Sequence, residues 1–102
     1  MMTLSVTRSR VAGVLSFAAG VLGVEGWDAD SDQRSLIGAI DRAAGCVPGK
    51  ASQDAEDTTT AAWEALSAHL AVEDPRAWEL AEGRTEGDVV AALRGASQAV
   101  TS

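Results

Sequence analysis

The chain has 102 residues, of which 46% are hydrophobic and 23% are charged, and it carries a formal net charge of −7. This length and balance indicate one soluble globular domain, residues 1–102, with a modest core, and they argue against intrinsic disorder. An acidic surface repels phosphates, so sequence-independent nucleic-acid binding is not expected. The single cysteine cannot form an internal disulfide.

The first predicted helix follows residues 1–8, a candidate disordered segment, and ends near Gly23 or Gly26. Its candidate N-caps are Ser5, Thr7 and Ser9. Apolar residues recur at the spacing of one helix face: Val11, Val14, Leu15, Ala18 and Leu22, widened by Phe17 and Val21.

The same segment has a second interpretation as a secretory signal. Two arginines precede the uncharged, mostly apolar residues 11–24, which resembles the order of a signal peptide. No small-x-small cleavage site follows, because Glu25, Trp27 and Asp28 intervene. The run is also too short to cross a bilayer, which takes about twenty residues. We therefore expect a cytoplasmic protein without a membrane span, and secretion is the alternative.

The second predicted helix follows the polar turn "GWDADSD" and ends at Gly45. Ser31 or Asp32 is its expected N-cap. Its apolar stripe consists of Leu36, Ile37, Ile40 and Ala44. Gly38 lies inside this helix, where glycine costs about 1 kcal/mol relative to alanine, and we expect it to let another helix approach closely.

Residues 45–56 are the longest predicted loop, with a turn at Pro48-Gly49. A third helix is predicted from Asp57 to Val72, with Ala62, Leu66 and Leu70 on its apolar side and Trp63 and His69 beside them. Asp74-Pro75 begins a short helix that carries Trp78 and extends to about Glu82, before Gly83.

The last helix begins within "GRTEGDVVAALRGAS", residues 83–97. Thr85 is the predicted N-cap and Asp88 occupies the position of a capping-box acid. Arg84, just outside the helix, is available to pair with an acid. The stripe Val89, Ala92, Leu93, Ala96 and Val100 follows. Together the segments predict an all-α fold, a compact bundle of four main helices and one short helix.

Neither a metal site nor a catalytic site is expected. Asp28-x-Asp30-x-Asp32 copies the first ligand positions of a calcium loop, but Gln33 and Ala39 stand where glycine and glutamate are needed. Cys46 and His69 could meet as a thiolate and its base. We interpret the cysteine instead as a small hydrophobic residue and the histidine as partly buried. The sequence therefore predicts no cofactor and no enzymatic activity.

The candidate interaction residues are Trp27, Trp63, Trp78 and Arg84. Tryptophans supply much of the buried area in a small alanine-rich core. An exposed tryptophan would instead be an anchor for a partner, because this residue is enriched at interface hot spots.

Several short stretches resemble a family of small actinobacterial and actinophage proteins described as domain of unknown function 6197. They are Gly26-Trp27, residues 36–40, residues 66–70, Ala77-Trp78 and residues 83–96. This chain has Glu79-Leu80 where members often carry Asn-Asp, and it lacks a cysteine near the start of the second helix. The resemblance implies an actinobacterial or phage origin and a cytoplasmic setting, and it implies no reaction.

These observations favour a non-enzymatic interaction module that binds another protein or itself, for example as a homodimer. One alternative is an acidic decoy that occupies the nucleic-acid-binding surface of a basic protein, because residues 25–102 hold fifteen acidic and six basic residues. A further alternative is a small-ligand-binding protein, whose pocket would combine a tryptophan with Arg84 and carboxylates.

Overall fold

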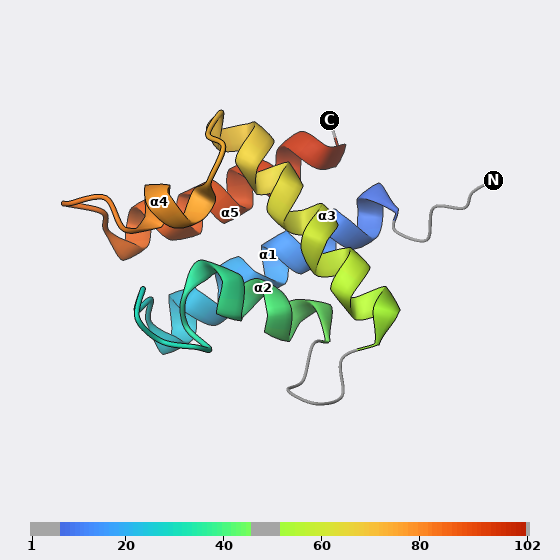
Figure 1. Ribbon diagram of the computed structural model, residues 1–102, viewed down its shortest axis with the longest axis horizontal. Coiled ribbons are helices and arrows are strands. Elements are labelled where there is room, and N and C mark those ends of the chain that lie inside the picture. Colours follow the sequence, from blue (N-terminus) through green and yellow to red (C-terminus); the bar gives the residue numbers. More distant parts are fainter. Residues whose placement is uncertain (1–6, 46–51, 102) are drawn as a thin grey trace.

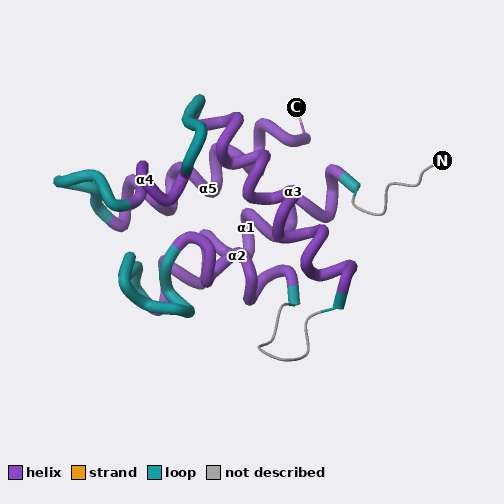
Figure 2. Tube along the Cα trace, in the orientation of Figure 1, coloured by secondary structure: helices purple, strands orange, loops and turns teal. Residues whose placement is uncertain are grey.

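The computed structural model describes residues 7–45 and 52–101. These residues form five helices and no strand (Figures 1 and 2), which confirms the predicted all-α bundle of four main helices and one short helix. The helices are α1 (Arg8–Glu25), α2 (Leu36–Ala44), α3 (Gln53–Leu70), α4 (Pro75–Glu79) and α5 (Glu86–Thr101). Within residues 7–45 and 52–101, no helix has the length and hydropathy of a membrane span.

Helix α1 is the centre of the packing. It makes its most extensive contacts with α5 and also packs against α2 and α3. Helices α1 and α5 run antiparallel (Figure 1). The Ser97 hydroxyl donates to the Ala12 carbonyl near one end of the pair, and the Trp27 amide donates to Glu86 near the other. The largest fully buried apolar side chains of the core are Leu15, Leu22, Leu36, Ile40, Leu66, Leu93 and Val89.

Most helix ends follow the predicted caps. The side chain of Thr7 caps α1, Asp74 caps α4, and Gly45 ends α2 with a left-handed φ of 90°. At the start of α5, the Thr85 hydroxyl accepts a bond from the Asp88 amide and the Asp88 carboxylate accepts one from the Thr85 amide. This reciprocal arrangement confirms the capping box.

The start of α2 corrects the prediction. Ser35 is the N-cap instead of Ser31 or Asp32, because the Ser31 hydroxyl already accepts the amides of Gln33 and Arg34 in a turn that precedes the helix. The missing side chain of Gly38 makes room for this turn and not, as predicted, for another helix. A Cβ at Gly38 would lie 2.8 Å from the carbonyl carbon of Asp32.

The predicted loop at 45–56 is too long and α3 begins earlier than Asp57. Ser52 caps the helix, and Asp54 and Glu56 lie in its first turn, where the positive end of the helix dipole stabilises their negative charges. Helix α3 also ends two residues earlier than predicted, at Leu70. Residues 46–51, which include Cys46 and the Pro48-Gly49 turn, lie outside the described residues, as do residues 1–6 of the predicted disordered segment.

The predicted apolar stripe of α1 is correct for its buried side and wrong for Phe17. Val14, Leu15 and Leu22 are buried, whereas Phe17 is 62% exposed. Helical periodicity cannot assign Phe17, because α1 is apolar or small on both its inner and its outer side. On α2, Ile37 is only half-buried, in contrast to its predicted place in the stripe.

Candidate functional site

Trp78 and Arg84, two of the predicted interaction residues, form an internal pair. The guanidinium carbon of Arg84 lies 3.9 Å from the centroid of the Trp78 ring. Arg84 Nε also donates to the Trp78 carbonyl at 2.9 Å, and Asp88 lies 3.9 Å from the guanidinium. Arg84 therefore pairs with an acid as predicted, and it also fixes the chain between α4 and α5 by a cation–π contact.

Trp27 belongs to a polar junction centred on Glu79, a residue that the sequence analysis did not select. Only 1% of Glu79 is exposed. Its Oε2 accepts hydrogen bonds from Trp27 Nε1 at 2.9 Å and from the Leu36 amide at 2.8 Å. Its Oε1 accepts a bond from Arg76 Nη1 at 2.8 Å, and the same nitrogen donates to the Ala29 carbonyl.

The Glu79 junction has a structural role that follows from its geometry. Leu36 is the first residue of α2, so the carboxylate lies at the positive end of that helix. Burying a carboxylate is tolerable only when donors surround it, and three donors from separate segments do so here. Glu79 thereby joins α4 to α2 and to the turn at residues 26–35. The spacing of Arg76 and Glu79 was the one local signal for this pair.

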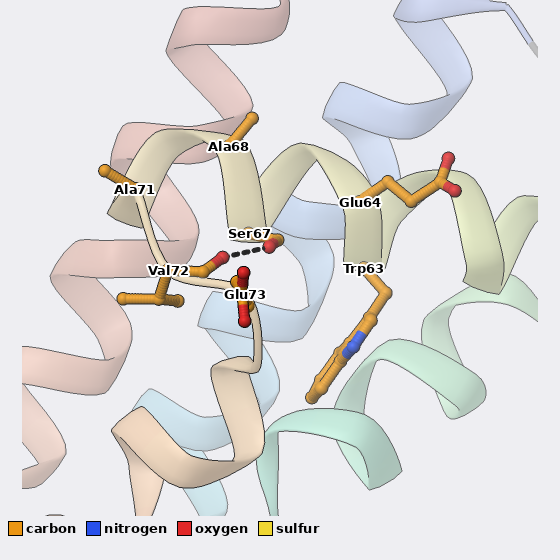
Figure 3. A pocket seen from close by; sticks show the side chains of 7 residues that line it. All are labelled: Trp63, Glu64, Ser67, Ala68, Ala71, Val72 and Glu73. Carbon is orange, nitrogen blue, oxygen red and sulfur yellow. Dashed lines mark hydrogen bonds between the residues drawn. The ribbon is translucent and has the colours of Figure 1, made fainter.

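Trp63 lies apart from these groups, at a surface hollow of about 530 Å³ near the end of α3. Figure 3 shows seven residues between Trp63 and Glu73 that line it. Ala71, beyond the end of α3, has a left-handed φ of 56°. The Ser67 hydroxyl donates to the Val72 carbonyl and closes this turn (Figure 3). Arg84 does not line the hollow, so the predicted combination of tryptophan and Arg84 is absent from it.

The outer side of α1 is a second hollow surface. Phe17, Gly20, Val21, Val24 and Glu25 line a shallow depression of about 340 Å³. Val24 is 87% exposed, which is more than Phe17. Between Arg10 and Glu25 the helix carries no charged residue on either side. An apolar outward side is unusual for a surface helix.

The residues considered for metal or nucleophilic chemistry form no cluster of metal ligands in the described part of the chain. His69 is exposed and not partly buried as predicted, and its ring lies against α5, where a Cβ at Gly95 would be 2.9 Å from Cε1. Cys46 lies outside the described residues. Asp28 accepts a bond from the Asp30 amide and lies 3.6 Å from Arg34. Residues 7–45 and 52–101 contain no group of three or more metal-ligating side chains.

The pKa values of two carboxylates near α2 are shifted in opposite directions. Arg42 forms two hydrogen bonds with Glu25, at 2.9 and 3.0 Å, and these lower the pKa of Glu25 below its usual value. The same bonds raise the pKa of Arg42. Burial raises the pKa of the Asp41 carboxyl, and its hydrogen bond with Thr59 opposes that shift.

Comparison with known proteins gives one match. No curated protein and no solved structure resembles the chain significantly. A model of a family of unknown function, DUF6197, matches residues 6–99. This range includes every described helix except the last residues of α5. The chain therefore belongs to the DUF6197 family, whose function is unknown.

Proposed function

We propose that the protein is a non-enzymatic interaction module that associates with a second copy of itself through the outer face of α1. This outer face consists of Gly13, Ser16, Phe17, Gly20 and Val24. The observation that carries the proposal is the exposure of Phe17 and Val24, 62% and 87%, on a helix face with no charged residue between Arg10 and Glu25. Exposed apolar surface of this kind is typical of contact sites between proteins.

The glycines of α1 support a close helix–helix contact. A Cβ at Gly13 or Gly20 would meet no atom within 4 Å, so nothing within the described chain requires glycine at either position. Each nevertheless costs about 1 kcal/mol of helix stability relative to alanine. Absent side chains would let a second backbone approach closely, and Phe17 and Val24 could then pack onto the vacant positions.

One antiparallel register satisfies both pairings. Residues 17 and 20, and residues 13 and 24, are symmetric about the same point of the helix. Phe17 of each copy therefore faces Gly20 of the other, while Val24 faces Gly13. This is the self-complementary contact that a two-fold axis generates.

Charge complementarity favours the same orientation. The register places Arg10 at the level of residues 25–28 of the second copy, which include Glu25 and Asp28. Arg10 and Glu25 pair with Asp54 and Arg42 in their own chain, yet 41% of each side chain remains exposed. A parallel pair would instead bring the two basic ends together.

The dimer is expected to be weak. Helix α1 has 18 residues, so its outer face is about 27 Å long and about 10 Å wide, or roughly 300 Å² on each copy. Stable interfaces bury about 800 Å² on each partner. The net charge of −7 on each chain also opposes association.

Analytical ultracentrifugation over a wide concentration range tests the proposal. The weight-average mass is expected to rise with concentration from the monomer value of 10.5 kDa toward twice that value. Phe17→Glu should abolish the rise. The matched control is Leu80→Glu, because Leu80 is also an exposed large hydrophobic residue, 54% exposed, but lies at the end of α4.

Circular dichroism must first show that both variants keep the helical fold. A wild-type chain that stays monomeric at the highest concentration would overturn the proposal. Equal loss of association in Phe17→Glu and Leu80→Glu would also overturn it, because the contact would then not depend on α1.

A further inference from the structure

The three tryptophans of the chain differ in the partners of their rings and ring N–H groups. Trp27 donates its ring N–H to Glu79, and the Trp78 ring lies against the Arg84 guanidinium. Among the described residues, the Trp63 indole N–H has no acceptor and its ring faces no cation. Trp63 instead borders the hollow at the end of α3, at a half-buried position.

The Trp63 hollow carries negative charge without an internal partner. Glu64 and Glu73 line it, and neither forms an ion pair within residues 7–45 and 52–101; no basic side chain lines it. Figure 3 shows the Glu73 side chain next to Ser67 and on the same side of α3 as the Trp63 ring, whereas Glu64 extends away from both. Glu73 is therefore the carboxylate better placed to act together with the indole.

The contact between Trp78 and Arg84 indicates which chemical group fits such a surface. There a guanidinium stacks on an indole while a carboxylate, Asp88, lies 3.9 Å from it. The Trp63 hollow offers an indole and a carboxylate but lacks the cation. A guanidinium is planar and weakly hydrated, so it can stack on the ring and hydrogen-bond to a carboxylate at once.

We infer that the hollow at the end of α3 binds the arginine side chain of a partner polypeptide. The guanidinium stacks on Trp63 and donates hydrogen bonds to Glu73. The chain's net charge of −7 attracts basic segments toward it. This site lies on α3, so it is independent of the proposed self-association through α1.

The test uses the three indole N–H signals in a ¹⁵N–¹H spectrum of the full chain. The probe is the peptide acetyl-Gly-Arg-Gly-amide, and Trp63→Phe identifies the Trp63 signal. The arginine peptide should shift the Trp63 signal and leave those of Trp27 and Trp78 in place. The same peptide with citrulline, which is isosteric but uncharged, should cause no shift.

Charge variants sharpen the test. Glu73→Gln is expected to weaken binding by about two- to five-fold, the range of an exposed ion pair. Glu56→Gln, which removes an equal charge at the opposite end of α3, should leave the affinity unchanged. The inference is overturned if the Trp63 signal does not move, if citrulline moves it equally, or if the two variants weaken binding alike.

Discussion

The junction of α2 with α4 and the outer face of α1 are built in opposite ways. At the junction, a carboxylate that is 1% exposed accepts three hydrogen bonds, and the backbone of Asp32 approaches Gly38 too closely for any side chain. On the outer face, Phe17 and Val24 are exposed and the space beside Gly20 is open. Interactions within the chain account for the junction completely, whereas they leave the composition of the outer face without a cause.

Replacing Glu79 by alanine should cause the largest loss of stability. Trp27 Nε1 and the Leu36 amide would lose their acceptor, and Arg76 would lose its carboxylate partner and keep only the Ala29 carbonyl. We expect the free energy of unfolding to fall by about 3 kcal/mol, within the range measured for broken buried networks. Urea denaturation at a fixed protein concentration measures it. Glu82→Ala is the control, because Glu82 is exposed and unbonded; a similar loss there would contradict the role of Glu79.

Gly38→Ala should be the next most damaging change. The added Cβ would press against the backbone of Asp32, which cannot move as a flexible side chain could. The cost of overpacking, about 1–3 kcal/mol, should exceed the gain of about 1 kcal/mol in helix propensity. A midpoint of thermal unfolding equal to or above that of the wild type would show that the turn before α2 is not fixed.

Gly20→Ala should have the opposite sign. With no atom within 4 Å of the new methyl group, the variant should gain about 0.5–1 kcal/mol in unfolding free energy through helix propensity. Measured in a Phe17→Glu background, urea denaturation isolates this gain from association. Ultracentrifugation of the single variant should show a weaker dimer, and unchanged association would contradict the antiparallel register.

Glu25→Gln should give the smallest effect, and one that depends on pH. Because Arg42 lowers the pKa of Glu25 in the folded chain, its stabilisation is present above the usual value of 4.5 and is lost as the pH falls through the lowered pKa. The variant should therefore be less stable than the wild type at pH 7. The difference between their free energies of unfolding should disappear in acid. Urea denaturation across this pH range measures the difference.

Asp41 supplies a comparison of opposite sign. Burial raises its pKa in the folded chain. Its favourable contribution to the free energy of unfolding is therefore fully present below pH 3.8, the usual pKa, and is lost as the pH rises through the raised pKa. Asp41→Asn removes this titrating group. The free energy of unfolding of the variant should therefore fall less between acid and neutral pH than that of the wild type. The same trend in Glu25→Gln and Asp41→Asn would contradict the assigned shifts.

Local signals were sufficient for most of the fold. Helical periodicity and the capping box at Thr85 and Asp88 predicted the helices, because each depends on residues within a few positions of one another. The cap of α2 was misassigned because Ser31, Asp32 and Ser35 are all good caps, and the turn in which Ser31 accepts the amides of Gln33 and Arg34 decides between them.

The candidate sites were less predictable because their partners are distant in sequence. Glu79 meets Trp27 and Leu36, which lie 52 and 43 residues away, and no local pattern indicates that it is buried. The pairing of Arg84 with Asp88 was predictable from their spacing, but the stacking on Trp78 depends on how α4 meets α5. Phe17 was assigned to the core because both sides of α1 satisfy the same periodicity.

The hydrogen bond from the Leu36 amide to Glu79 has a consequence for folding. The first amide of α2 finds its acceptor only when a residue 43 positions later has docked, so the start of α2 cannot be completed before α4 is in place. Contacts of such long sequence separation form late and slow the folding of small domains. Slow hydrogen exchange at this one amide would thus report that the first and second halves of the polypeptide have come together.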